Sequence, residues 1–156
     1  MHPAVKKNGK QAIGRSRGGW NTKIHALTTG DTHLKCFILS GGEAHDAPQG
    51  RLLLETSGKQ EITVPLLMDK AYADFTTRFT AWNLRFQPVV PPKTNMKDQW
   101  EYDKELYKKR NEIERFFRRL KAFRAVFTRY DKLDVMFSGT IFFASIIILL
   151  RCVNTP

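Results

Sequence analysis

The chain has 156 residues, a length that suggests one domain, and 42% of them are hydrophobic, which is enough for a sizeable core. Its formal net charge of +11 favours a polyanionic partner, nucleic acid before an anionic membrane, although a basic surface that only aids solubility has the same composition. The two cysteines, Cys36 and Cys152, have neither a metal-binding spacing nor a disulfide framework, and the polar, basic N-terminus lacks the apolar stretch of a secretory signal.

Residues 1–22 are rich in lysine, arginine and glycine, and no acidic residue occurs before Asp31. We expect a flexible basic arm or loop whose glycines allow close approach to phosphates, with a disordered terminus as the alternative. Residues 22–29 and 33–39 have the composition and alternation of strands, and Gly30 and Asp31 between them form a turn signal. The sequence therefore predicts a hairpin after the arm.

A helix is predicted at residues 47–56 and an apolar strand at residues 62–68, where Pro65 indicates an edge strand or a bulge. Asp69 follows this strand directly. Open α/β sheets bind ligands at the carboxyl ends of their strands, so Asp69 is a candidate site residue, although an Asp at this place also caps turns. A helix at residues 73–84, a strand at 86–90 and a polar loop at 93–100 complete this part of the chain.

A long helix from residue 103 to about residue 127 has the strongest periodicity in the chain. At 100° per residue, four polar residues fall within an arc of about 60°. These residues are Tyr107, Arg110, Glu114 and Lys121. The neighbouring apolar sector is expected to face the core. It contains Ile113, Phe116, Phe117, Leu120, Phe123 and Phe127. The stripe indicates a carboxylate held between cations at the edge of the core, and plain surface ion pairs are the alternative.

Residues 135–150 contain no charged residue. A membrane-spanning helix needs about 20 apolar residues, so we expect a buried helix here, with a membrane span as the alternative.

The four spacings of the polar stripe resemble the Y-R-E-K signature of bacterial insertion-sequence transposases. Residues 68–72, with Asp69, resemble the D-K-A-Y-D segment around the second catalytic Asp of that family. Residues 14–19 and 22–26 resemble the G-R-S-R-G-G and T-K-I-H segments of the branch called insertion-sequence family five. The resemblance extends over about residues 2–151, and its combined motifs are specific.

The resemblance implies a DDE-type transposase with an α/β, RNase H-like fold, in which a mixed central sheet is flanked by helices over residues 23–156. It implies cutting and joining of DNA at the terminal inverted repeats and at a target site, by phosphodiester chemistry that depends on Mg²⁺ or Mn²⁺ held by Asp69 and Glu114. Tyr107, Arg110 and Lys121 would complete the catalytic residues. Further DNA contacts are expected from Arg15, Arg17, Lys23, Lys70, Lys93 and Arg118.

The first catalytic Asp of the family precedes the stretch that matches His2, so we expect this chain to lack that Asp and its strand. Two classes of function besides the enzyme remain open. One is a non-catalytic DNA-binding remnant of such a transposase, and the other is a basic protein anchored to a membrane by its last helix. We expect a cytoplasmic, nucleoid-associated homo-oligomer without a membrane partner.

Overall fold

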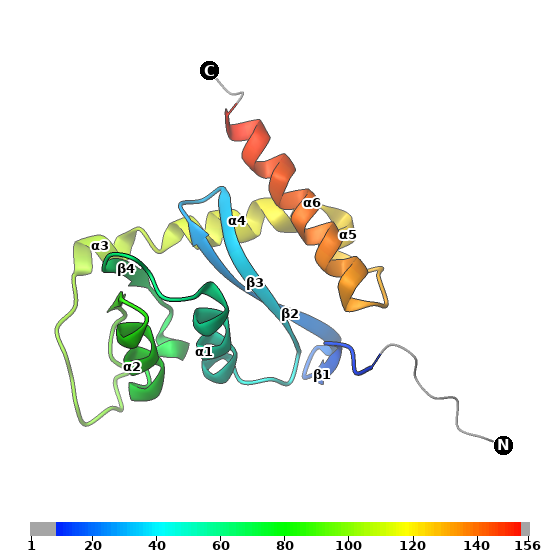
Figure 1. Cartoon of the computed structure of the whole chain (residues 1–156). Helices are drawn as coiled ribbons and strands as arrows, with labels where there is room; N and C mark the ends of the chain where they lie inside the picture. The colour runs from blue at the N-terminus through cyan, green and yellow to red at the C-terminus, as the bar shows by residue number, and fades with distance from the viewer. Residues whose placement is uncertain (1–8, 154–156) are drawn as a thin grey trace.

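Residues 9–153, the part of the chain that the computed structural model describes, begin with three strands and end with four helices (Figure 1). The strands are β1 (Gly14–Ser16), β2 (Gly19–Thr29), β3 (His33–Gly41), β4 (Val64–Leu67) and β5 (Phe86–Val89). The helices are α1 (Asp46–Ser57), the 3-10 helix η1 (Lys70–Tyr72), α2 (Phe75–Asn83), α3 (Lys104–Lys108), α4 (Asn111–Lys121), α5 (Arg124–Thr128) and α6 (Asp134–Val153).

The predicted hairpin is confirmed as β2 and β3, which pair in antiparallel register. Gly30 in their turn has a φ of 69°, a conformation that suits glycine. Residues 14–21 were expected to belong to a flexible arm or loop, but residues 14–16 form β1 and residues 19–21 begin β2, with a turn at residues 17 and 18. Gly19, with a φ of 101°, permits the turn that brings β1 back onto β2. Residues 1–8 of the predicted arm lie outside the described residues.

The strands form two sheets. β1, β2 and β3 make an antiparallel sheet in that order, whereas β4 and β5 pair with each other in parallel. The predicted α/β class is therefore confirmed, but the prediction of one central sheet is wrong for residues 9–153. The physical reason is that no described strand lies between β2 and β4 to carry hydrogen bonds from one sheet to the other.

Two hydrophobic cores lie on different sides of the hairpin (Figure 1). The first lies among β4, β5, α1 and α2 and includes Leu54, Leu66 and Phe86. The second packs α4, α5 and α6 against β2 and β3 around Phe116, Leu120 and other buried residues, while Ile24, Ala26 and Phe37 contribute from the hairpin. Leu27 of β2 packs on the first core, so the hairpin contributes side chains to both.

The predicted long helix is divided into α3, α4 and α5. Lys109, Arg110 and Glu112 each donate a backbone hydrogen bond to the residue three positions before, and these tighter turns separate α3 from α4. Phe116 and Leu120 are fully buried, as predicted, but Phe127 is 72% exposed. Its predicted burial is wrong because the helix ends after Lys121, and the angular phase of the earlier turns does not continue into α5.

The apolar C-terminal segment forms α6, which is long and apolar enough to cross a membrane by length and composition. Its inner face, with Phe137, Ile141, Ala144 and Ile148, packs in the second core, so the predicted burial holds for this face. Its outer face is exposed. The large exposed side chains there are Val135, Met136, Phe142, Phe143, Ile146, Leu149, Leu150 and Val153.

Candidate functional site

Two carboxylates that lie far apart in the sequence converge on one guanidinium. Nη1 of Arg110 is 3.5 Å from Oδ2 of Asp69, and Nη2 of Arg110 is 2.7 Å from Oε1 of Glu114. The Arg110 side chain is 25% exposed, whereas those of Asp69 and Glu114 are 55% and 51% exposed. The guanidinium is thus the inner member of the group, and both carboxylates face solvent.

Asp69 is positioned by the end of β4 and the start of η1. Its Oδ1 accepts a hydrogen bond of 3.1 Å from the backbone N–H of Ala71, which caps the 3-10 turn. This is the capping role that the sequence left open as an alternative. The cap uses one carboxylate oxygen and leaves Oδ2 directed toward Arg110, so capping and participation in the site are compatible.

Arg110 and Glu114 are positioned by the junction of α3 and α4. Arg110 immediately precedes α4, and Glu114 lies in the first turn of that helix. Residues four apart lie on the same helical face, which accounts for their ion pair. A carboxylate in the first turn also interacts favourably with the positive end of the helix dipole.

Tyr107 lies beside this group on α3. The Arg110 guanidinium is 5.8 Å from the centre of the Tyr107 ring, and the Tyr102 ring contacts the same phenol at 5.5 Å. Burial raises the pKa of the Tyr107 phenol, and the nearby Arg110 opposes this effect. The phenol is therefore neutral at physiological pH and available as a hydrogen-bond donor.

A cavity of about 350 Å³ lies behind the two carboxylates and is lined by Asp69, Arg110 and Glu114 together with residues of β2, β4 and α1. Buried His25 lies on its wall, where Nε2 is 2.8 Å from Oγ of Ser40 and Nδ1 is 3.4 Å from the Tyr72 hydroxyl. Burial lowers the pKa of His25 and raises the pKa of Tyr72 to about 12. Both groups are neutral near pH 7, and these contacts favour a structural role for His25.

The acidic groups supply an incomplete metal site by themselves. No group of three or more His, Cys, Asp or Glu residues that could hold a metal occurs in the described part of the chain. Asp69 and Glu114 nevertheless offer the oxygen ligands that Mg²⁺ prefers. Mg²⁺ in proteins is often held by one or two carboxylates while it keeps several waters, so this pair fits one partly hydrated ion.

The other predicted site residues do not join this group. Lys121 lines a different cavity, which also contains Lys23. Nζ of Lys23 is 2.9 Å from Oδ1 of Asp46 and 2.8 Å from the Ala44 carbonyl, so it ties the hairpin to α1. Lys93 is half-buried in the loop after β5. The remaining predicted DNA contacts are exposed: Arg15, Arg17, Lys70 and Arg118.

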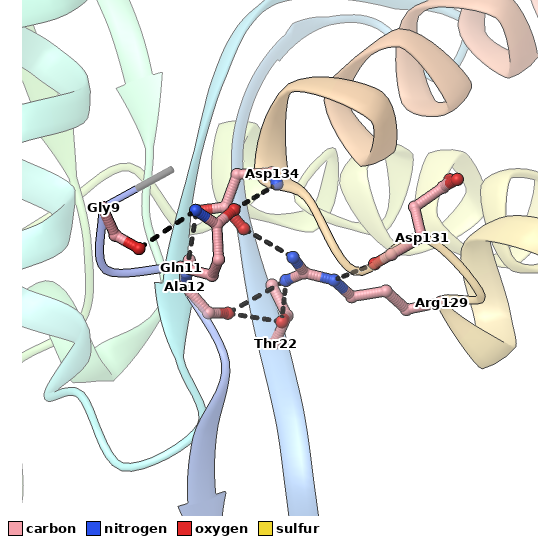
Figure 2. Close-up of polar contacts among 7 residues, drawn as sticks. All are labelled: Gly9, Gln11, Ala12, Thr22, Arg129, Asp131 and Asp134. Carbon is pink, nitrogen blue, oxygen red and sulfur yellow. Dashed lines mark hydrogen bonds and ion pairs between the residues drawn. The ribbon is translucent and has the colours of Figure 1, made fainter. Parts of the chain in front are cut away.

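Sequence reasoning missed a second arginine centre, at Arg129 (Figure 2). Its guanidinium forms an ion pair with Asp134 and donates hydrogen bonds to the Ala12 carbonyl at 3.0 Å, to the Asp131 carbonyl at 3.1 Å and to the Thr22 hydroxyl. The Arg129 side chain is only 10% exposed. The group ties the segment before β1 to β2 and to the start of α6.

Asp134 completes this second centre from the other side. Its Oδ2 accepts a hydrogen bond of 2.7 Å from the Ala12 N–H, and its own N–H donates to Oε1 of Gln11 at 2.6 Å (Figure 2). Arg129 has a φ of 46°, which is unusual for a residue with a side chain. No local pattern around Arg129 predicts its contacts with Ala12 and Thr22, because these two partners lie more than a hundred residues earlier in the chain.

Comparisons with known proteins give two matches. The model of the transposase DDE domain family matches residues 2–149. A Brucella ovis protein, named as the candidate transposase of insertion sequence element IS6501, is 31% identical over 131 residues, which is 83% of this chain and 98% of that protein. No solved structure matches the chain. The family match includes the segments that hold Asp69, Arg110 and Glu114.

Proposed function

The chain belongs to the transposase DDE domain family, and from this premise we propose that it cuts and joins DNA at the ends of an insertion sequence, with Asp69 and Glu114 as ligands of a divalent metal. One observation carries the proposal. Asp69 and Glu114, from different elements, converge on Arg110 beside a cavity. A solvated ion pair does not by itself require this convergence of two distant segments.

The metal is Mg²⁺ or Mn²⁺, and when bound it supplies stabilisation of charge on the phosphate oxygens and a more acidic water. The chain's own residues bind and orient the DNA around it. Arg110 balances the two carboxylates in the free protein, and its planar guanidinium suits a phosphate oxygen pair once a metal takes over that balance. The neutral Tyr107 phenol donates a hydrogen bond to the DNA backbone.

Lys121 and the exposed basic residues are proposed to bind the flanking phosphates. Glu114 and Lys121 are seven residues apart, which corresponds to about 10 Å along a helix. This separation suits contacts with different phosphates of one strand. The net charge of +11 supports binding of a duplex, and such binding is expected to weaken steeply with salt.

We further assign the domain to the RNase H-like class and place it on nucleoid DNA in the bacterial cytoplasm, as a homo-oligomer bound to the inverted repeats and the target. The mixed α/β architecture supports the class. The exposed apolar face of α6 supports self-association, since apolar patches of this kind mark interaction sites.

The test is nicking of supercoiled DNA that carries the inverted repeats, with and without Mg²⁺. We expect slow, Mg²⁺-dependent nicking, because two carboxylates place a metal less firmly than a full set. Nicking should disappear in Asp69→Asn and in Glu114→Gln and persist in Glu105→Gln, whose carboxylate pairs only with Lys108 on the surface of α3. DNA binding without any nicking by the unmodified chain would overturn the proposal in favour of a non-catalytic DNA-binding protein.

A further inference from the structure

The exposed face of α6 has a regular spacing along the whole helix. Its central positions, here called the seam, alternate three and four residues apart. They are Met136, Gly139, Phe143, Ile146, Leu150 and Val153, and all six are exposed. Apolar residues that recur on average every 3.5 residues are typical of a helix that packs lengthwise against another helix.

The seam lies on the side of α6 that faces away from the second core. The residues that pack in that core are also spaced four and three apart, and they are Phe137, Ile141, Ala144 and Ile148. At 100° per residue, the two sets lie about 160° apart around the helix. A helix that covers one core needs one apolar stripe, whereas α6 has two, and only 28% of its apolar stretch is buried. The second stripe has the character of an interface.

The area of this face is sufficient for a stable dimer. Eight large apolar side chains on α6 are each more than a third exposed. A Phe side chain offers about 150–250 Å², so each exposed part is on the order of 100 Å² and the face amounts to roughly 800 Å². A stable interface of standard size buries about 800 Å² on each partner.

Gly139 indicates both the partner and its orientation. No atom of residues 9–153 lies within 4 Å of the place that a Cβ of Gly139 would occupy, so the seam has a gap there. If two copies of α6 pair in antiparallel orientation about the midpoint of Phe143 and Ile146, Gly139 faces Leu150 of the second copy, and Phe143 faces Ile146. A parallel pair would place Gly139 opposite Gly139 and leave a void, which is destabilising. Antiparallel helices also bring opposite ends of their dipoles together.

We propose that α6 binds α6 of a second copy of this chain in antiparallel orientation, with Leu150 of each copy packed on Gly139 of the other. The dimer has a two-fold axis, so each contact occurs twice. The proposal rests on the self-association named in the proposed function and assigns its surface and geometry. Two copies with a net charge of +11 repel each other, so salt should strengthen the dimer, whereas salt weakens binding to DNA or to an anionic membrane.

Sedimentation equilibrium of the full chain, without DNA or metal, tests the pairing in Gly139→Leu. The new side chain should collide with Leu150 of the second copy and raise the dissociation constant of the dimer at least about tenfold. Within one chain it extends into open space, and Leu favours a helix more than Gly, so the fold should not weaken. A parallel dimer would instead tighten, because the leucines fill the void, and binding to lipid vesicles would gain from the added apolar surface.

A second change and a control locate the effect. Gly139→Leu combined with Leu150→Ala restores a small residue opposite a large one, so the double variant should recover most of the lost affinity. Thr76→Leu adds a leucine at an exposed position of α2 and should self-associate as the unmodified chain does. Circular dichroism reports whether each variant is folded.

A spin label on Cys152, in a Cys36→Ser background, measures the orientation directly. Cys152 is exposed near the end of α6. In the antiparallel dimer the two labels are offset by about 15 residues, or roughly 22 Å along the helix axis, whereas in a parallel dimer only the helix separation of about 8–10 Å lies between them.

Three outcomes would overturn the proposal. A chain that stays monomeric at low and at high salt would remove the α6 pairing together with the proposed self-association. A dimer that Gly139→Leu does not weaken would remove the pairing and leave self-association through another surface. A short distance between the labels would exclude the antiparallel orientation. None of these outcomes affects the nicking assay, which tests the metal and the carboxylates.

Discussion

Arg110 and Arg129 gather acidic partners in similar ways but in different surroundings. Arg110 contacts Asp69 and Glu114, both of which are about half exposed. Arg129 contacts Asp134 and three further oxygens and is itself 10% exposed. Ion pairs in water contribute little to stability, whereas a buried charge depends on its partners. The Arg129 centre therefore stabilises the fold, whereas the Arg110 centre is free to exchange partners.

One pair of residues lies between the two centres. His25 and Tyr72 line the cavity beside Arg110 and also the larger cavity beside Arg129. They connect the hairpin to η1 through the contact between the His25 ring and the Tyr72 hydroxyl. Gly50 of α1 packs so closely on the Tyr72 ring that a Cβ at this position would lie 2.6 Å from ring atoms. The Tyr72 ring is therefore fixed from the α1 side as well.

The largest expected effect is on stability, in Arg129→Met. This change leaves the Asp134 carboxylate and the Ala12 carbonyl without their cationic donor in a largely buried setting. We expect the free energy of unfolding to fall by roughly 3 kcal/mol, the lower end for breaking a buried pair because Asp134 retains some exposure. Urea denaturation followed by circular dichroism measures this.

Arg124→Met is the matched control, because Arg124 is exposed at the start of α5, the short helix that Arg129 directly follows. Its midpoint should stay close to that of the unmodified chain. Equal losses in the two variants would show that removal of any basic residue near α5 has this effect, and the contrast between the two arginine centres would fail.

A smaller effect is expected in Arg110→Met, and it concerns metal affinity. Without the guanidinium, Asp69 and Glu114 have no compensating cation, so Mn²⁺ binding in the absence of DNA should strengthen about fivefold, which corresponds to two exposed ion pairs worth roughly 1 kcal/mol together. The unfolding free energy should change by less than about 1 kcal/mol for the same reason. Mn²⁺ titration monitored by electron paramagnetic resonance measures the affinity.

Lys108→Met is the control for this change, since Lys108 pairs with Glu105 on the exposed side of α3. It removes one positive charge from the neighbourhood but none from the carboxylate pair. If Arg110→Met binds Mn²⁺ no better than Lys108→Met, Arg110 does not compensate the two acids, and the metal-ligand assignment loses its support.

The sequence predicted the pairing of Arg110 with Glu114 better than it predicted which other residues join the Arg110 centre. Arg110 and Glu114 are four residues apart, and helical geometry places such residues together whether or not the helix is long. Lys121 was assigned to the same polar stripe because of its angular position on the helix. Angular position does not report how far apart two residues lie along the helix axis, and Lys121 lines a different cavity. The approach of Asp69 depends on how β4 packs beside α4, which periodicity does not encode, and it was expected here from motif resemblance.

Other differences have similar causes. The aromatic residues Phe75, Phe79 and Trp82 have helical spacing, but all three are exposed, and α2 instead buries Thr77 and Ala81. Periodicity identifies the helix without stating which face meets the core. The Arg129 centre was missed because it joins Arg129 to Ala12 and Thr22, which are distant in the chain, and no local spacing reports such contacts.

The smallest expected effect is a pH dependence at His25, between the two centres. Burial lowers its pKa, with Asp46 opposing and Lys23 adding to the shift. The folded-state pKa thus lies below the unfolded value of about 6.5, the unfolded chain binds more protons between the two values, and stability is full above about pH 6.5 and is lost as the pH falls toward the folded pKa. One such group contributes a slope of at most about 1.4 kcal/mol per pH unit.

Urea midpoints between pH 7 and pH 5 should therefore fall less in His25→Gln than in the unmodified chain. The control is His33→Gln, which changes an exposed histidine and should keep the full slope of the unmodified chain. Parallel slopes for His25→Gln and the unmodified chain would mean that His25 can take up a proton without loss of its Ser40 and Tyr72 contacts, and that the region between the two centres is open to water.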